Sequence, residues 1–470
     1  MRLNNELLPH QKAAVEKLIK LKVGALFMEQ GTGKTITVLE IVRNRFEAGK
    51  IETVIWLCPC SAKENIKREI IKQCPGELLK CFTICGIETL SSSIRAISYL
   101  LGLTEKKKCF LVVDESLLIK NPGAYRTENI LRIGQKCEYR MILNGTPVSR
   151  NESDLFSQFF LLDWRILGYR SYWSFAANHI EFDEYGKLHK VLNTDRLAEK
   201  IAPYTYLVKK CDCIKLPGKK YDVCYFDLTE EQNAEYARVA EILLEKVNEW
   251  HSDTVYRLFS GLQAVISGKR LKFNKGASHF DTVEMFENPM NNPRIERLMD
   301  IIQDFQDSEK AIIFCRYESE ISQLCEILPE AVRFDGKTSL KKRDEALKEF
   351  SKKKRYLIAN RNCAGYSLNL QFCHNIIYMS NDWDLGTRLQ SEDRVHRIGQ
   401  DKKVEIIDVC AVNTIDEQIL KCLWNKESLL ESIKKEVDKN VTNDKKNVLK
   451  KYIYGNRYKH EIFDCSELKD

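Results

Sequence analysis

The 470-residue chain has no apolar run near the roughly 20 residues that a membrane-spanning helix needs. Its polar N-terminal segment also lacks the charged and apolar regions of a signal peptide. We therefore expect an intracellular protein that is not secreted and has no membrane partner. At 44% hydrophobic residues, the chain is nevertheless able to bury substantial cores.

The pairs of cysteines that would hold zinc are also missing. The 17 cysteines are scattered through apolar segments, and the two close pairs, Cys58/Cys60 and Cys211/Cys213, have only one residue between their members. Zinc sites need pairs with wider gaps and later partners, so this distribution favours reduced, structural thiols. No zinc finger, recognition helix, RNA-binding motif, bromodomain-like or chromodomain-like module is evident, which suggests a minimal protein of microbial or viral source.

The net charge of +7 is too small to require a nucleic-acid partner, although it permits one. Lysines gather near the end of the chain, from Lys434 to Lys459, with three tyrosines among them. Such a tail could follow a phosphate backbone, or it could be a solvated helix or a partly disordered end. The composition leaves these alternatives open.

A glycine-rich turn stands near the start of the chain. The short apolar segment 24–27 predicts a buried strand, Met28-Glu-Gln-Gly-Thr-Gly-Lys-Thr35 follows it, and residues 36–46 have helical spacing. Backbone N–H groups of such a turn can bind phosphates at the positive end of the helix dipole. Lys34 would reach the β- and γ-phosphates, and the Thr35 hydroxyl would hold Mg²⁺. The first glycine of the usual pattern is replaced by Met28.

Two further predicted strands also end in residues that suit the binding of a nucleotide and its metal ion. The apolar run 109–113 ends in Asp114-Glu115, and the strand 141–143 ends in Asn144-Gly-Thr-Pro147. In a parallel sheet these ends would lie beside the phosphate loop. There Asp114 can bind Mg²⁺, Glu115 can polarise the attacking water, and the Asn144 turn can sense the γ-phosphate. Three such junctions predict a nucleotide-hydrolysing α/β lobe.

The second half predicts another parallel α/β lobe without a second phosphate loop. Segments 311–314, 356–359, 375–378 and 404–407 are apolar and of strand length, with helical patterns between several of them. In the segment 390–400, Arg394 and Arg397 stand three residues apart and would share one face of a helix. Two guanidinium groups there can stabilise charge in the transition state, as arginine fingers do.

These motifs together resemble the Swi/Snf-like branch of the superfamily 2 helicases, over residues 8–418. The segments that carry the resemblance include Leu8-Pro-His-Gln11, Trp56-Leu-Cys-Pro59, Asp114-Glu-Ser-Leu-Leu-Ile-Lys-Asn121, Cys363-Ala-Gly-Tyr-Ser-Leu-Asn-Leu370 and Leu389-Gln-Ser-Glu-Asp-Arg-Val-His-Arg-Ile-Gly-Gln400. The resemblance implies two tandem RecA-like lobes with ATP in the cleft between them, and a DNA-dependent ATPase that translocates along duplex DNA with Mg²⁺ as cofactor.

The resemblance also implies the residues of the site. Those expected to contact ATP are Gln11, Gly31, Thr32, Gly33, Lys34, Thr35, Gly145, Thr146 and Gly365. Thr35 and Asp114 are expected to hold Mg²⁺, while Lys34, Glu115, Arg394 and Arg397 are expected to act in catalysis. Those expected to contact DNA are Ser61, Lys63, Ser367 and Asn369. Departures from the family pattern, which leave the metal-binding and water-polarising residues in place, are Leu117, Asn144, Ala364 and Ser367.

The expected domain order is a first lobe over residues 1–216, a helical protrusion and linker over 217–292, a second lobe over 293–424 and a basic tail over 425–470. We expect a monomer that binds DNA with little sequence preference. Two other functions remain open at this point: a strand-separating helicase of the same superfamily, and an ATP-gated nucleic-acid clamp with little turnover.

Overall fold

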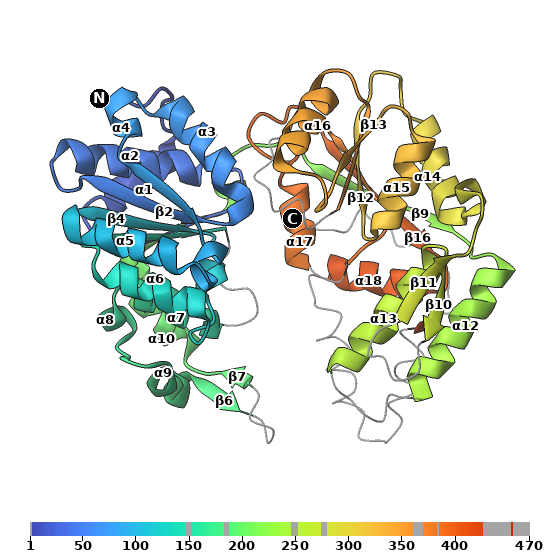
Figure 1. Cartoon of the computed structure of the whole chain (residues 1–470), viewed down its shortest axis with the longest axis horizontal. Helices are drawn as coiled ribbons and strands as arrows, with labels where there is room; N and C mark the ends of the chain where they lie inside the picture. The colour runs from blue at the N-terminus through green and yellow to red at the C-terminus, as the bar shows by residue number, and fades with distance from the viewer. Residues whose placement is uncertain are drawn as a thin grey trace. The chain divides into compact units, whose positions relative to one another are not determined.

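The structure is a computed structural model of the chain, and it describes residues 2–145, 152–182, 188–245, 252–273, 280–360, 370–382, 385–425 and 453–454. The described residues form two compact units that divide after Leu216. Each unit contains one six-stranded sheet with helices packed on it (Figure 1). The predicted class, two tandem α/β lobes of the RecA-like kind, is therefore confirmed.

The sheet of the first unit is parallel throughout, with the strand order β3-β2-β4-β5-β1-β8. Its strands are β1 (Val23–Met28), β2 (Thr53–Cys58), β3 (Phe82–Gly86), β4 (Cys109–Asp114), β5 (Tyr139–Asn144) and β8 (Thr205–Val208). Three central strands, β1, β2 and β4, are buried along their whole length. Helices cover both faces of a parallel sheet, so such strands are continuous apolar runs in the sequence.

Side chains of the first sheet alternate between two separate cores. Val54 and Trp56 pack on one face with helices α1 to α4, whereas Ile55 and Leu57 pack on the other with helices α5 to α10 (Figure 1). The helices are α1 (Pro9–Leu18), α2 (Lys34–Glu47), α3 (Lys63–Gln73), α4 (Gly76–Leu79), α5 (Ile94–Lys106), α6 (Tyr125–Gln135), α7 (Leu155–Leu162), α8 (Trp164–Leu167), α9 (Tyr172–His179) and α10 (Thr194–Ile201). A short hairpin, β6 (Ile180–Phe182) and β7 (Leu188–Val191), follows α9.

The sheet of the second unit is also parallel throughout, with the order β13-β14-β12-β15-β16-β9. Its strands are β9 (Lys219–Phe226), β12 (Ala311–Cys315), β13 (Ala331–Phe334), β14 (Tyr356–Asn360), β15 (Asn375–Tyr378) and β16 (Val404–Ala411). The four strands that the sequence predicted for this lobe are β12, β14, β15 and β16.

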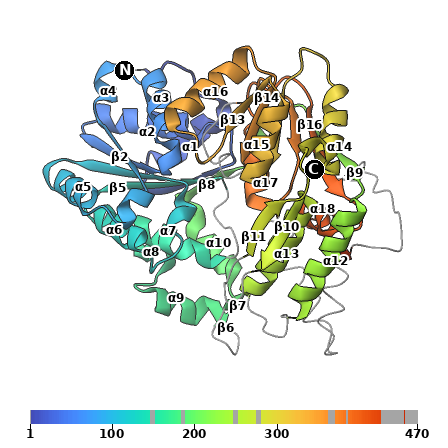
Figure 2. The ribbon, with the colours of Figure 1, turned by 45° about the vertical axis from the view of Figure 1, so that its right-hand side comes forward.

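Helices of the second unit also connect its strands. They are α12 (Glu230–Glu245), α13 (Ser252–Ile266), α14 (Pro293–Gln303), α15 (Glu318–Ile327), α16 (Leu340–Lys352), α17 (Leu385–Glu392) and α18 (Ile415–Trp424). An antiparallel hairpin, β10 (Lys269–Phe273) and β11 (Phe280–Glu284), lies beside α13 (Figure 2). No helix among the described residues has the length and apolar character needed to cross a membrane.

Residues 217–292, the predicted helical protrusion and linker, begin with a strand that the sequence did not predict. The polar-looking segment 219–226 is strand β9, which pairs with β16 and forms one edge of the second sheet. Its lysines and aspartate mask the strand pattern, because an edge strand is less completely buried than a central one. The helical part of this predicted protrusion consists of two helices, α12 and α13, that pack on each other.

Candidate nucleotide-binding site

The phosphate loop joins β1 to α2, as the sequence predicts. Gly31 and Gly33 have φ angles of 82° and 92°, in the left-handed region that favours glycine. Gly33 precedes Lys34, the first residue of α2, and the helix therefore begins directly at the loop. The Lys34 ammonium donates a hydrogen bond of 2.9 Å to the carbonyl oxygen of Met28. Backbone N–H groups at a helix N-terminus favour a bound phosphate.

A pair of side chains from α1 holds this loop in place. Gln11 Nε2 donates to the Thr32 carbonyl oxygen at 2.9 Å, and His10 Nε2 donates to the same oxygen at 2.8 Å. The Gln11 Oε1 atom accepts from the backbone N–H of Leu8 at 2.9 Å. Gln11 therefore connects the start of α1 with the loop, and its contact with adenine stays a prediction.

The acidic pair stands at the end of β4, two strands away from β1 in the sheet. Asp114 is buried, and its Oδ1 atom accepts from the Glu115 backbone N–H at 3.1 Å. Glu115 has a φ of 53°, which is uncommon for a residue with a side chain and costs free energy. A short 3₁₀ turn, Ser116–Ile119, follows Glu115 directly, and the Glu115 side chain is half-buried.

The end of β5 lies between these two features. Residue pairing places Asn144 opposite Phe27 of β1, and Leu143 opposite Asp114 of β4. A Cβ atom added to Gly145 would lie 3.9 Å from Lys34 Nζ. The ends of β4, β5 and β1 therefore bring together the acidic pair, Gly145 and Lys34 at one edge of the first sheet.

A group of polar contacts holds the segment that follows the acidic pair. The sequence analysis did not identify these contacts. The buried Ser116 hydroxyl donates to Gln158 Oε1 at 2.6 Å, and Gln158 Nε2 donates to the Asp154 carbonyl oxygen at 2.8 Å. Lys120 forms an ion pair of 3.5 Å with Asp154. These contacts connect the segment after β4 with α7. The polar pair Ser157-Gln158 within an apolar helix was the only sign of them in the sequence.

The predicted Mg²⁺ ligands fit the chemistry of that ion. Thr35 and Asp114 offer hydroxyl and carboxylate oxygens, and Mg²⁺ prefers such ligands. No group of three or more His, Cys, Asp or Glu side chains arranged to hold a metal occurs in the parts of the chain that the structure describes. Mg²⁺ in nucleotide sites is held by one or two protein ligands together with phosphates and waters, so the sparse donor set suits it.

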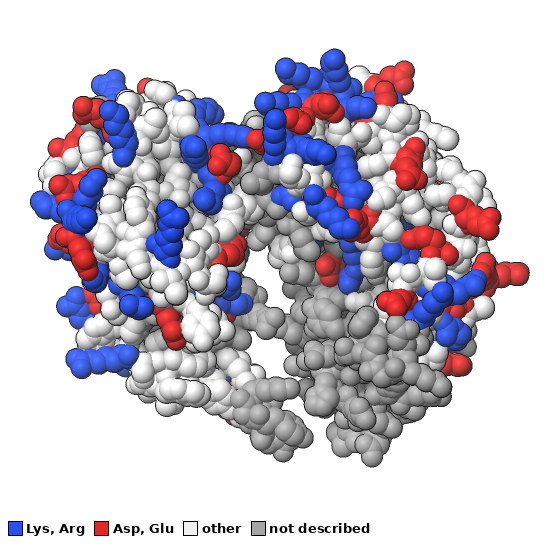
Figure 3. Space-filling view, in the orientation of Figure 1, with Lys and Arg blue, Asp and Glu red and all other residues white. Residues whose placement is uncertain are grey.

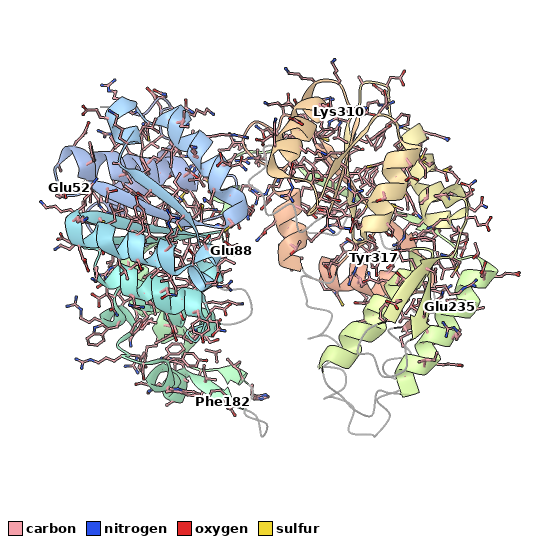
Figure 4. The ribbon with its side chains drawn as sticks, viewed as in Figure 1. Glu52, Glu88, Phe182, Glu235, Lys310 and Tyr317 are labelled. Atoms are coloured by element: carbon pink, nitrogen blue, oxygen red, sulfur yellow. The ribbon has the colours of Figure 1, made fainter. Side chains whose placement is uncertain are left out.

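Two of the predicted DNA contacts also follow a strand of the first sheet. Ser61 lies in a short 3₁₀ turn after β2, and Lys63 is the first residue of α3. Glu88, labelled in Figure 4, accepts from the backbone N–H of Cys60 at 2.9 Å and anchors this turn. The positions Thr146, Gly365, Ser367 and Asn369 lie outside the described residues.

Arg394 and Arg397 belong to the second unit, and the prediction that a helix carries them is wrong. Helix α17 ends at Glu392, and residues 393–399 form successive turns. The Arg394 carbonyl oxygen accepts from the Leu370 backbone N–H at 3.1 Å, and the His396 ring donates to the Pro217 carbonyl oxygen at 2.7 Å. With these contacts, the backbone after Glu392 does not continue the helix. We call residues 394–397 the arginine turn.

The arginine turn is fixed to the unit by Val395 and by the residues that follow the turn. Val395, between the two arginines, is fully buried, and both Arg394 and Arg397 are half-buried. Gln400 Nε2 donates to the Cys373 carbonyl oxygen at 2.9 Å. Gly399, with a φ of 95°, adopts a conformation in which a side chain would be strained.

Positive charge is concentrated on residues 337–355 of the second unit, which include α16, and the sequence analysis also missed this segment. Residues 337–355 contain nine Lys or Arg and three Asp or Glu, a net charge of +6 in a chain of net charge +7. Figure 3 shows Lys and Arg gathered over this helix. Lys341, Lys348 and Lys352 are exposed and lie on one side of α16, because residues seven and eleven apart nearly coincide in helical direction. We call these three residues the α16 lysine row.

Three family models match the chain. They are the "SNF2-related domain" over residues 80–274, the "Helicase conserved C-terminal domain" over residues 293–399, and the "Type III restriction enzyme, res subunit" over residues 4–116. A phosphate loop, an acidic strand end and two parallel α/β units are the features of a nucleotide-binding protein. With the SNF2-related and helicase C-terminal matches, the chain belongs to the Swi/Snf-like branch of the superfamily 2 helicases.

Similar proteins come from bacteria, plants and archaea. An "Uncharacterized ATP-dependent helicase MG018" of Mycoplasma genitalium is 24% identical, and the match covers 91% of this chain and 42% of that protein. "ATP-dependent DNA helicase DDM1" of Arabidopsis thaliana is 23% identical, with 91% and 63% covered. The first three relatives are matched over only 40–42% of their own length. The solved "Sulfolobus solfataricus SWI2/SNF2 ATPase core in complex with dsDNA" is 22% identical, with 96% of this chain and 98% of that chain covered and a TM-score of 0.41.

Gly33→Ala tests the geometry of the phosphate loop. The added Cβ would lie 2.2 Å from Gln11 Nε2, and its backbone would remain strained at positive φ. We expect ATP binding to weaken by about tenfold, since strain of this kind costs about 1–3 kcal/mol. Titration with a fluorescent ATP analogue measures the effect. Gly102→Ala, where no atom lies within 4 Å of the added Cβ, is the matched control. Equal affinity of the two variants would contradict the loop geometry.

Proposed function

We propose that the chain is an ATP-dependent motor that hydrolyses ATP when it binds duplex DNA and translocates along it, remodelling DNA or protein–DNA complexes. The observation that carries this proposal is the meeting of Lys34, the Asp114-Glu115 pair and Gly145 at one edge of the first sheet. The family supports a DNA-stimulated reaction, and the relatives include named ATP-dependent helicases and a chromatin-remodelling ATPase. Within this proposal the protein acts inside the cell, as a monomer.

Residues of the first unit perform binding and activation of water. Lys34 exchanges its hydrogen bond with the Met28 carbonyl oxygen for the β- and γ-phosphate oxygens. The Glu115 carboxylate orients the attacking water and accepts a proton from it. Its side chain has no hydrogen-bond or ion-pair partner among the described residues, so no protein contact has to be broken first. The Ser116–Gln158 hydrogen bond keeps the turn after β4 in position.

ATP is the proposed substrate, with its phosphates on the loop of Gly31, Thr32 and Gly33, and its adenine read by Gln11. Thr35 and Asp114 would hold Mg²⁺, which neutralises phosphate charge when bound. Thr146 and Gly365 are proposed nucleotide contacts as well, and the neighbouring Gly145 contributes backbone close to Lys34. The buried Asn144, which replaces a threonine common in the family, donates no hydrogen bond from Nδ2 within the described residues. A γ-phosphate oxygen would satisfy this amide.

Arg394 and Arg397 are the proposed source of transition-state charge stabilisation. Both are carried by the arginine turn rather than by a helix, and the buried Val395 between them limits how far the turn can shift without moving α17. Guanidinium groups that reach the transferring phosphoryl group contribute about 10³–10⁵ in rate in other nucleotide hydrolases. Binding and release of ATP would then alternately engage and free the second unit, which supplies the motor stroke.

Ser61 and Lys63 are proposed contacts of the first unit with the phosphate backbone, and Ser367 and Asn369 are those of the second. The α16 lysine row adds a second basic surface of the second unit. A helix rises 1.5 Å per residue, so the row is about 16 Å long and can face several successive phosphates. None of the three lysines pairs with another of the described residues. Such contacts give affinity without sequence preference.

Lys34→Ala and Arg397→Ala separate binding from chemistry. Lys34→Ala removes the phosphate contact, so we expect turnover to fall to background. Arg397→Ala should lower kcat by about 10³ while ATP affinity stays nearly unchanged, since the arginine acts on transition-state charge. Steady-state hydrolysis with duplex DNA and equilibrium ATP binding give both quantities. Lys12→Ala, on the exposed side of α1, is the control. Full activity of either site variant would contradict the proposed site.

Replacing the α16 lysine row with glutamine tests its contact with DNA. For Lys341→Gln/Lys348→Gln/Lys352→Gln we expect the slope of log affinity against log salt to become shallower by about 2–3, because each lost phosphate contact removes about 0.9. Fluorescence anisotropy with labelled duplex DNA at several salt concentrations measures this slope. The control Lys12→Gln/Lys20→Gln/Lys50→Gln removes the same charge from exposed positions of the first unit. Equal slopes of log affinity against log salt for the two variants would show that the α16 lysine row does not contact DNA.

A further inference from the structure

Arg316, directly after β12, connects the sheet of the second unit with helix α13. Its Nη1 atom donates to Gln263 Oε1 at 2.6 Å, and its Nη2 atom donates to Ser260 Oγ at 3.3 Å. Nη1 also lies 3.3 Å from Asp382 Oδ1, beyond the end of β15. The hydroxyl of Tyr317, labelled in Figure 4, donates to the Ser260 carbonyl oxygen at 3.1 Å. Two consecutive side chains therefore hold α13 at the carboxyl end of β12.

Gln263 extends this connection to the end of β15. The side chain is 1% exposed, and its Nε2 atom donates to the Asn381 carbonyl oxygen at 2.7 Å. Asn381 is also buried; its Nδ2 atom donates to Asp408 Oδ1 at 2.6 Å, and its Oδ1 atom accepts from Arg388 Nη1 at 2.7 Å. One amide thus joins Arg316 to the backbone of Asn381, whose side chain is bound to Arg388.

Arg388 fixes α17 to the sheet. Its guanidinium forms two hydrogen bonds with Asp408, of 2.6 and 2.9 Å, and its Nε atom donates to Glu392 Oε1 at 2.7 Å. The same group lies 3.4 Å from the centre of the Tyr378 ring. Burial favours loss of the Arg388 proton, but attraction by Asp408 outweighs it and raises the pKa of Arg388. The group therefore stays charged, and the paired geometry is maintained.

Glu392 is the last residue of α17 and precedes the arginine turn by two positions. Its backbone carbonyl oxygen accepts from the N–H groups of Val395 and His396, at 3.0 and 2.9 Å. Its carboxylate accepts from Lys219 at 2.8 Å and from the Tyr221 hydroxyl at 2.9 Å, both on β9. Burial opposes ionisation here, but Arg388 and Lys219 outweigh it and lower the pKa of Glu392. A continuous set of polar contacts therefore runs from α13 to the residues that carry Arg394 and Arg397.

From this set of contacts we infer that Arg316 is a positioning residue, which acts through Gln263 and Arg388 to hold the arginine turn in its productive position. A displacement of α13 changes the turnover of ATP. The inference rests on the proposed role of Arg394 and Arg397. Arg316 does not bind the nucleotide in this account, so its loss affects kcat and leaves the KM for ATP unchanged.

The contacts also explain how Arg316 can affect the arginine turn, although the two are far apart in the sequence. Each link is made by a side chain with little or no freedom: Gln263, Asn381, Arg388 and Glu392 are all at most 5% exposed. Buried polar groups that lose a partner are costly, since water cannot replace it. Removal of Arg316 leaves the Gln263 Oε1 atom without its donor, and the neighbouring contacts must rearrange.

The test compares Arg316→Gln with Arg238→Gln in the 470-residue chain, in the presence of duplex DNA. Arg238 is an arginine of α12 whose guanidinium donates to Glu235, labelled in Figure 4, and to the Leu271 carbonyl oxygen. We expect Arg316→Gln to lower kcat by about tenfold with KM for ATP within about twofold of the wild type, and Arg238→Gln to change neither. Thermal unfolding is measured for both variants.

A double variant tests whether Arg316 and Gln263 act through the same contact. Gln263→Leu should lower kcat to a similar extent, and Arg316→Gln/Gln263→Leu should lower it no further than either single change, because both break the same link. If Arg316→Gln does not fold, Gln263→Leu and Gln263→Glu take its place, and the glutamate variant keeps an acceptor for Arg316 while it loses the donor to Asn381.

Two outcomes overturn the inference. One is an unchanged kcat, and the other is a loss of kcat no larger than that of Arg238→Gln or accompanied by a matching rise in KM. Arg397→Ala distinguishes this failure from failure of the proposed function. If Arg397→Ala lowers kcat as expected and Arg316→Gln leaves kcat unchanged, only the positioning role is wrong. If Arg397→Ala is fully active, the proposed site itself is wrong.

Discussion

Parallel pairing of β4, β5 and β1 is the constraint on which the rest of the structure depends. Because the three strands run in the same direction and in fixed register, the loops after them share one edge of the sheet. Lys34 and Gly145 are 111 residues apart in sequence, with the Asp114-Glu115 pair between them, and this strand pairing brings them together. A slip of one residue would turn every side chain of a strand to the opposite face, and the two apolar cores prevent it.

The second unit uses the same architecture for a different purpose. One face of its sheet carries an apolar core shared with α13, α14, α15 and α18, whereas the other face carries the Arg388–Asp408 pair under α17. A buried charged pair contributes little net stability compared with apolar packing of the same volume. Its geometry, by contrast, is specific, because bidentate contacts allow one orientation of the guanidinium. The arginine turn therefore begins from a helix whose position is fixed by polar contacts.

Much of this structure follows from the sequence, for identifiable physical reasons. The strands β1, β4, β5, β12, β14, β15 and β16 are mainly apolar segments, and the phosphate loop and acidic pair follow such segments directly. Strand β9 and the arginine turn were not predictable in this way. An edge strand can be polar, and the turn is set by contacts with Leu370 and Pro217, which are distant in sequence. The Ser116–Gln158 bond and the Arg316–Gln263 link likewise depend on tertiary contacts.

The central claim is that duplex DNA activates ATP hydrolysis at the edge of the first sheet. Its most direct test is steady-state hydrolysis without nucleic acid and then with single-stranded DNA, duplex DNA or RNA, with Glu115→Gln as the baseline. The account predicts strong stimulation of the wild type by duplex DNA and none of the variant. Stimulation only by single strands or RNA would indicate a strand-separating helicase instead. Turnover no higher than that of Glu115→Gln under every condition would contradict the account and indicate a nucleic-acid clamp.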